Sequence, residues 1–106
     1  MEFKDIIAKA TEIREKYKIY EEKTYGQTWT KENVAEGLVG DVGDLMKLVL
    51  AKQGVRQIDN VDEKLAHELS DCLWSIIILA QLYNVDLETA FVTNMDKLKA
   101  HIENNT

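Results

Sequence analysis

The absence of proline is the feature that most constrains what this chain can fold into. Proline occurs nowhere in the 106 residues, and glycine occurs only five times. Proline interrupts helices, and folds with many tight turns use both residues heavily. The composition therefore favours long, uninterrupted helices joined by a few short connections.

Apolar residues recur at spacings of three and four in four segments, which is the period of an amphipathic helix. We expect helices over residues 3–20, 31–53, 61–83 and 87–102, with a polar loop over 21–28. The residues suited to cap these helices are Thr28 or Thr30, Asp59 or Asn60, and Asp86 at N-terminal ends, and Gly54 after the second helix.

The apolar stripes of the middle two helices define the expected core. The second helix carries Val34, Leu38, Val42, Leu45, Leu48 and Val49, and the third carries Leu65, Leu69, Cys72, Leu73, Ile76 and Leu79. The third helix is apolar on more than one face, and such a helix lies in the middle of an assembly. We therefore predict a single all-α domain over residues 1–106, a four-helix-type bundle that forms a homodimer or a dimer of dimers.

Composition and charge exclude several classes of function. Hydrophobic residues make up 45% and charged residues 30%, as in globular proteins, and the net charge of −6 argues against stable nucleic-acid binding. The lone Cys72 cannot form an internal disulfide, and the first residues lack an apolar signal core. Since the longest apolar run, 76–80, is too short to span a bilayer, we expect a cytoplasmic protein without a membrane partner.

Two pairs of carboxylates interrupt the apolar stripes. Asp41 lies between Leu38 and Leu45, with Asp44 three residues on, and the third helix repeats the arrangement with Glu68 and Asp71. Residues at i and i+3 project from one helix face, and neither stripe contains a lysine or arginine. Four such carboxylates repel one another unless a cation lies between them, and carboxylate oxygens suit Mg²⁺ or Mn²⁺. An equally weighted alternative is a solvated acidic edge of the bundle.

Three glycines recur every third residue inside the second helix. Gly37, Gly40 and Gly43 together cost roughly 2–3 kcal/mol of helix stability relative to alanine. Either close packing of another helix or access for a ligand explains them equally well.

The residues from Asn33 to Leu45 and from His67 to Asp71 resemble the MazG-like all-α nucleoside triphosphate pyrophosphohydrolases, and look closest to the dCTP-pyrophosphatase branch. The family pairs ExxE on one helix with ExxD on the next, and the similarity extends over 29–101. Here both glutamates of the first pair are aspartates, which shortens the reach of each by about 1.5 Å.

The resemblance implies a Mg²⁺-dependent enzyme, with Mn²⁺ as a possible substitute, that cleaves a (deoxy)nucleoside triphosphate to the monophosphate and pyrophosphate in a house-cleaning role. It implies Asp41, Asp44, Glu68 and Asp71 as metal ligands, and one of these four carboxylates, with Glu68 as the first candidate, as the residue that accepts a proton from water. It also implies that Asn94 and Lys97 contact the nucleotide.

Aromatic and histidine residues near these motifs allow two interpretations each. Trp29 can stack on a nucleobase or act as a hydrophobic staple before the second helix. Trp74 is expected in the core or the subunit interface rather than on a pocket wall, and His67 on the surface.

Two other functions fit the same sequence. A related family hydrolyses phosphoribosyl-ATP with a similar site. The aspartate replacements at positions 41 and 44 also fit a catalytically silent helical dimer that serves interaction or regulation.

Overall fold

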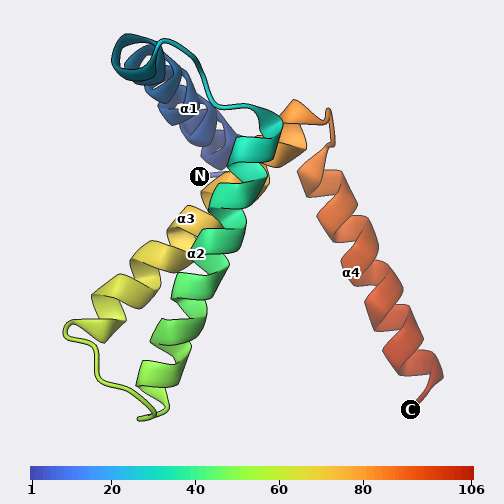
Figure 1. Cartoon of the computed structure of the whole chain (residues 1–106). Coiled ribbons are helices and arrows are strands. Elements are labelled where there is room, and N and C mark those ends of the chain that lie inside the picture. Colours follow the sequence, from blue (N-terminus) through green and yellow to red (C-terminus); the bar gives the residue numbers. More distant parts are fainter.

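The computed structural model describes all 106 residues as four α-helices without a β-strand (Figure 1). The helices are α1 (Phe3–Tyr25), α2 (Lys31–Lys52), α3 (Val61–Leu82) and α4 (Leu87–Asn104). The all-α class and the number of helices are confirmed.

The predicted caps of α2 and α4 are confirmed, whereas Asn60 lies at the N-cap of α3 without a side-chain cap hydrogen bond. Thr30 accepts a hydrogen bond from the Asn33 amide, and Asp86 accepts one from the Thr89 amide. The loop predicted over 21–28 is wrong, because α1 continues to Tyr25 and ends at Gly26 with φ 76°. The extension is stable because Glu21, in the supposed loop, is buried and paired with Arg14.

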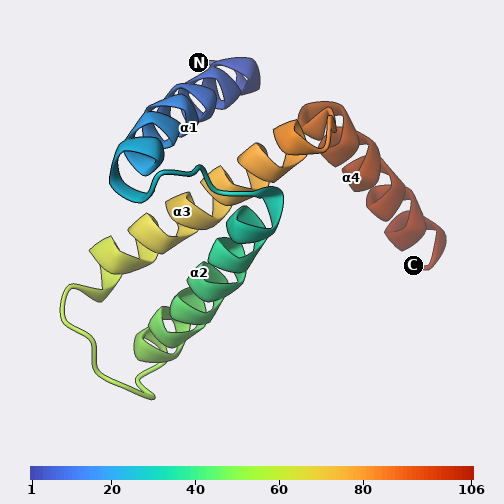
Figure 2. The same cartoon turned by 45° about the horizontal axis from the view of Figure 1, so that its top comes forward.

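The pair of helices α2 and α3 forms an antiparallel hairpin, and α1 packs across the C-terminal half of α3 (Figures 1 and 2). The fully buried cluster joins all three helices through Ala10 of α1, Val34 of α2, and Ile77 and Ile78 of α3. Helix α3 therefore lies in the middle, as its apolar composition predicted.

The buried faces of α2 and α3 differ from the expected stripes. Five residues of the predicted stripes are exposed rather than buried, and these predictions are wrong: Val42, Val49, Leu69, Leu73 and Ile76. Asp41 and Glu68 occupy the half-buried positions in their place. Helix α3 carries its own apolar residues on several faces, so the spacing of these residues does not identify which face packs against α2.

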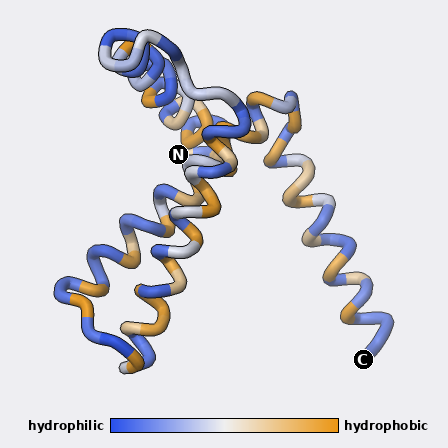
Figure 3. The backbone as a smooth tube through the Cα atoms, in the orientation of Figure 1, coloured by the Kyte–Doolittle hydropathy of each residue, from blue (hydrophilic) through white to orange (hydrophobic).

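Helix α4 leaves the end of α3 and extends away from the other three helices (Figure 1). Only Leu87, its first residue, packs against the core. The remaining residues are exposed, and they include the apolar residues Phe91, Met95, Leu98 and Ile102. Hydrophobic positions recur along the backbone of α4 in Figure 3. One chain therefore does not complete the expected bundle.

The surface of the single chain is large for its mass. It exposes 8091 Å², whereas a compact monomer of 12.2 kDa exposes about 6,100 Å². Its radius of gyration is 17.0 Å, against about 13 Å for a compact domain of this length. The excess reflects apolar faces that the chain does not cover by itself.

By length and composition alone, α3 is apolar enough to cross a membrane. The central helix of a globular domain meets the same criterion, and α3 packs against both α1 and α2. It also carries the half-buried acids Glu68 and Asp71. These features are those of a core helix.

Candidate active site

Three carboxylates from two helices converge at the middle of the α2–α3 interface. Asp41 and Asp44 come from α2 and Glu68 comes from α3, and one oxygen of each lies within 4.8 Å of the others. Three oxygens at this spacing can share one cation. The shorter aspartate side chains therefore still reach the acid on the neighbouring helix.

The Glu68 carboxylate has a buried oxygen without a partner. Its Oε2 atom is inaccessible to solvent and makes no hydrogen bond. Burial, and then the charges of Asp41, Asp71 and Asp44, raise the pKa of Glu68. Burial and the neighbouring Asp71 and Asp44 likewise raise the pKa of Asp41. The ionised forms of both carboxylates are therefore unfavourable in this environment. A bound divalent cation would stabilise them by neutralising their negative charge.

The fourth acid, Asp71, lies beside this trio and faces His67. The Nε2 atom of His67 is 3.0 Å from Oδ2 of Asp71, one turn away on α3. The His67 side chain is largely exposed, as expected. Burial and then the charges of Asp41, Glu68 and Asp71 raise the pKa of the buried Cys72 thiol, so this residue favours its protonated form.

A cavity of about 490 Å³ opens on one side of the acids. We call it the aromatic cavity, and it is lined by Ile13, Tyr17, Trp29, Val34, Gly37, Asp41, Ser70, Asp71, Trp74 and Ser75. The rings of Tyr17 and Trp74 lie 5.9 Å apart and are tilted by 51°. The cavity has the volume of a small-molecule site and combines aromatic walls with two carboxylates.

A second pocket of about 490 Å³ opens beside Asp44 and Glu68. We call it the lysine pocket, and its lining is Asp44, Lys47, Leu48, Ile58, Glu63, Lys64, His67 and Glu68. Its two lysines lie among three carboxylates, and Nζ of Lys47 is 3.8 Å from Oδ1 of Asp44. The sequence analysis missed Lys47 and Lys64. A signal was present, because Lys47 follows Asp44 by three residues and Lys64 precedes Glu68 by four.

The glycine row of α2 faces open space. A Cβ atom at Gly37, Gly40 or Gly43 would meet no other atom within 4 Å. Close packing of another helix of the same chain is therefore wrong as an explanation of the row. Gly37 instead contributes to the wall of the aromatic cavity.

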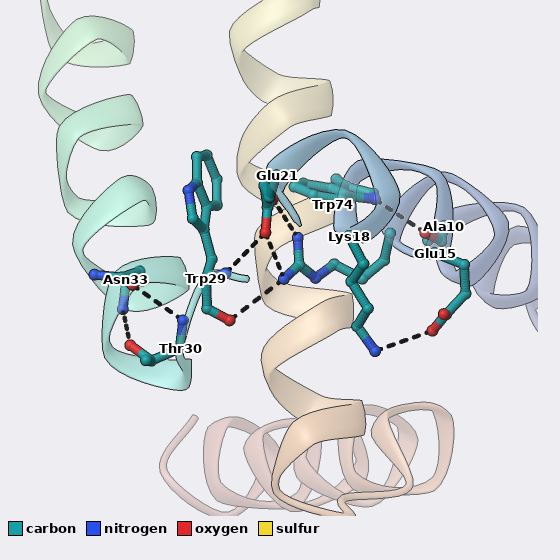
Figure 4. Close-up of polar contacts among 9 residues, drawn as sticks. Ala10, Glu15, Lys18, Glu21, Trp29, Thr30, Asn33 and Trp74 are labelled. Carbon is teal, nitrogen blue, oxygen red and sulfur yellow. Dashed lines mark hydrogen bonds and ion pairs between the residues drawn. The ribbon is translucent and has the colours of Figure 1, made fainter. Parts of the chain in front are cut away.

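Both tryptophans lie on the aromatic cavity. Trp29 precedes α2 and is 46% exposed, so its ring is available to a ligand. Trp74 packs against the core, as expected, and its Nε1–H donates to the Ala10 carbonyl oxygen at 3.1 Å (Figure 4). Trp74 also forms part of the cavity wall, which was the less favoured interpretation.

Asn94 and Lys97 are exposed on α4, and the structure does not bring them to the acids of their own chain (Figure 1). Their predicted contact with a nucleotide stays a prediction.

Residues 29–104 match the family model described as the MazG nucleotide pyrophosphohydrolase domain. The chain belongs to this family. The MazG chain is therefore a hydrolase that acts on pyrophosphate bonds of nucleotides, and the matched residues include all four acids. No curated protein and no solved structure gives a significant match.

The raised pKa values of Asp41 and Glu68 predict how stability of the metal-free MazG chain depends on pH. A folded state that holds its protons more tightly than the unfolded chain loses stability as pH rises through the raised pKa. The free energy of unfolding should therefore fall as pH rises from the ordinary carboxyl values, 3.8 for Asp41 and 4.5 for Glu68, through the raised ones.

Thermal unfolding in a chelator, over a series of acidic to neutral buffers, measures this effect. Glu21 titrates in the opposite sense because its pKa is lowered, so the comparison of wild type with Glu68→Gln isolates the contribution of the cluster. A pH dependence that is identical in both proteins would contradict the prediction.

Proposed function

We propose that this MazG chain is a Mg²⁺-dependent enzyme that hydrolyses a nucleoside triphosphate to the monophosphate and pyrophosphate. The observation that carries the proposal is the convergence of Asp41, Asp44 and Glu68 around an unpartnered, buried carboxylate oxygen. The site is built of hard oxygen donors, and such donors match Mg²⁺ or Mn²⁺ better than zinc.

The four acids would hold the cation between α2 and α3, with Asp41, Asp44 and Glu68 nearest one another and Asp71 beside them. When bound, the cation supplies positive charge for the phosphate oxygens and promotes deprotonation of water. The carboxylates fit this role because burial and mutual repulsion make their ionised forms costly without it.

Glu68 would accept the proton of the attacking water. A carboxylate has two oxygens, so Glu68 can face the cation with one and the water with the other. The water oxygen attacks the α-phosphorus, the bond from this phosphorus to the bridging oxygen breaks, and pyrophosphate leaves. A base within hydrogen-bond reach of the water typically contributes about 10²–10⁴-fold to the rate.

The two cavities on either side of the acids suggest how the nucleotide lies. The aromatic cavity would take the base, stacked on Trp29, and the lysine pocket would take the β- and γ-phosphates beside Lys47 and Lys64. The α-phosphate would then lie between them, next to Glu68, which lines the lysine pocket, and Asp41, which lines the aromatic cavity.

The substrate class follows from the resemblance to the dCTP-pyrophosphatase branch. We propose a pyrimidine deoxynucleotide, with dCTP as the first candidate, and a house-cleaning role in the cytoplasm. A panel of nucleoside triphosphates that includes phosphoribosyl-ATP, assayed for pyrophosphate release with Mg²⁺ and with Mn²⁺, tests this choice.

The chain is also proposed to act as a homodimer or homotetramer. Its excess surface of about 2,000 Å² lies within the range that each subunit of an obligate dimer buries, about 1,000–2,500 Å². The apolar face of α4 is uncovered, since every residue of this helix after Leu87 is exposed. In such an assembly, Asn94 and Lys97 would reach the nucleotide bound by a neighbouring subunit.

Replacing Glu68 with glutamine should lower the rate of pyrophosphate release at least about 100-fold, because the variant keeps the shape but lacks the proton acceptor and a cation ligand. Steady-state release of pyrophosphate from dCTP with Mg²⁺ measures the effect. Glu32→Gln, at an exposed position of α2, is the matched control and should retain wild-type activity. Full activity of Glu68→Gln would refute the assigned role.

Replacing Lys47 or Lys64 with glutamine should raise KM for the triphosphate by about threefold to tenfold, because each variant loses a charged contact to the phosphate tail. Initial rates over a range of nucleotide concentrations separate KM from kcat. Lys16→Gln removes an exposed lysine of α1 outside both cavities and serves as the control. An unchanged KM in both variants would place the phosphates elsewhere.

Analytical ultracentrifugation should give at least twice the chain mass of 12.2 kDa. Phe91→Glu places a charge on the apolar face of α4 and should shift the equilibrium toward monomer. Thr93→Glu, at an exposed position off that face, should not. A wild-type protein that sediments as a monomer would contradict the proposed assembly.

A further inference from the structure

A buried ion pair inside α1 lies next to the aromatic cavity and belongs to none of the roles described so far. Arg14 and Glu21 are 4% and 1% exposed, two turns apart on one face of the helix. The Nη1 atom of Arg14 donates to Oε2 of Glu21 at 2.8 Å, and Nη2 donates to Oε1 at 3.3 Å. Burial raises the pKa of Glu21, but the Arg14 hydrogen bond and the Trp29 amide outweigh it, so the pKa is lowered and the acid stays ionised.

The same pair holds both backbone polar groups of Trp29 (Figure 4). The Trp29 amide donates to Oε1 of Glu21 at 2.7 Å, and the Trp29 carbonyl accepts from Nη2 of Arg14 at 3.4 Å. Residues 27–29 make no other hydrogen bond, either through their backbone or through their side chains. The position of Trp29 therefore depends on this ion pair.

Trp29 borders two hollows. One is the aromatic cavity, and the other is lined by Tyr25, Gln27, Thr28, Trp29, Asn33, Glu36 and Gly37. Both hollows have room near the ring, so packing alone does not select one orientation of residues 27–29. The hydrogen bonds from the Trp29 amide and to the Trp29 carbonyl fix one orientation of these residues.

Stability alone is a poor explanation for the pair. A buried ion pair is often no more stabilising than apolar side chains of the same size, because both ions lose their hydration. Arg14 also leaves its Nε atom buried without a partner. The pair thus leaves one of its own polar atoms without a hydrogen bond, yet it bonds both backbone groups of Trp29. This combination fits a positioning role.

We infer that Arg14 and Glu21 are positioning residues that orient Trp29 for the nucleobase. The inference rests on the proposed function, because the nucleobase is assigned there to the aromatic cavity. The pair itself touches no substrate atom. Its removal should therefore weaken the binding of substrate and transition state equally, which raises KM and leaves kcat nearly unchanged.

Glu21→Gln tests this inference because it keeps the side-chain shape and removes the charge that holds Arg14. We expect KM for dCTP to rise by about tenfold, with kcat within about twofold of wild type. Glu15→Gln breaks the exposed Lys18–Glu15 pair of the same helix and serves as the matched control with wild-type KM. A wild-type KM in Glu21→Gln, with the protein folded, would overturn the inference.

The double variant Arg14→Met/Glu21→Leu separates positioning from folding. It replaces the pair with apolar side chains, so the melting temperature should remain near wild type while KM remains raised. If KM returns to the wild-type value together with the melting temperature, the pair serves stability only and the inference is wrong. The double variant also answers the question if Glu21→Gln fails to fold.

Fluorescence of Trp29 provides a readout that needs no catalysis. In a Trp74→Phe background, Trp29 is the remaining tryptophan, and its quenching by acrylamide without nucleotide should increase when Glu21→Gln is added. Unchanged quenching would overturn the positioning role whatever the activity. A wild-type enzyme that releases no pyrophosphate from any nucleotide would instead refute the proposed function and leave this measurement valid.

Discussion

Mutual repulsion among carboxylates at the α2–α3 interface is the constraint around which this chain is organised. Asp41, Asp44 and Glu68 bring oxygens within 4.8 Å of one another at a place where most helical proteins pack apolar side chains. The apolar contacts that hold the helices together lie on both sides of the acids, with Val34 two turns before Asp41 and Leu48 two turns after it. The hydrophobic effect thus confines charges that would otherwise separate.

The surroundings of the acids divide into two chemically different sides. Aromatic rings and Gly37 line the cavity that Asp41 faces, and lysines line the pocket that Asp44 and Glu68 share. A substrate with an aromatic base at one end and negative charge at the other matches this polarity. The buried Arg14–Glu21 pair is a second group of charges, in which the two charges neutralise each other. It forms hydrogen bonds with the backbone of Trp29.

Much of the fold could be predicted because helical periodicity and capping residues are local properties. The boundaries of α2 and α3 agree with expectation to within one residue. Asp41 is recognisable as a candidate site residue because it interrupts an apolar stripe. The buried face of α3 could not be predicted, since several of its faces are apolar. The path of α4 could not be predicted either, because its apolar face contacts nothing within the chain.

The parts of the site that were hardest to predict are charged residues whose role depends on a partner seven or more residues away in the sequence. Helix α1 continues through the polar run 21–25, which is typical of a loop, and the buried Arg14–Glu21 pair lies where this extension begins. A hint existed, because Ala10, Arg14, Tyr17 and Glu21 recur at helical spacing, but only Ala10 and Tyr17 fit an apolar stripe. Lys47 and Lys64 of the lysine pocket lie at helical spacing from Asp44 and Glu68, but lysines at such spacing are also common on exposed helix surfaces, so the spacing alone does not identify them as pocket residues.

Gly37 has a consequence for how the site can change over evolution. Its missing side chain leaves part of the wall of the aromatic cavity bare, and a Cβ atom there would touch nothing. Alanine at this position would favour the helix by about 0.8–1.0 kcal/mol. A single substitution can therefore make the cavity shallower while α2 gains stability, so the depth of the cavity and the stability of the helix oppose each other at this position.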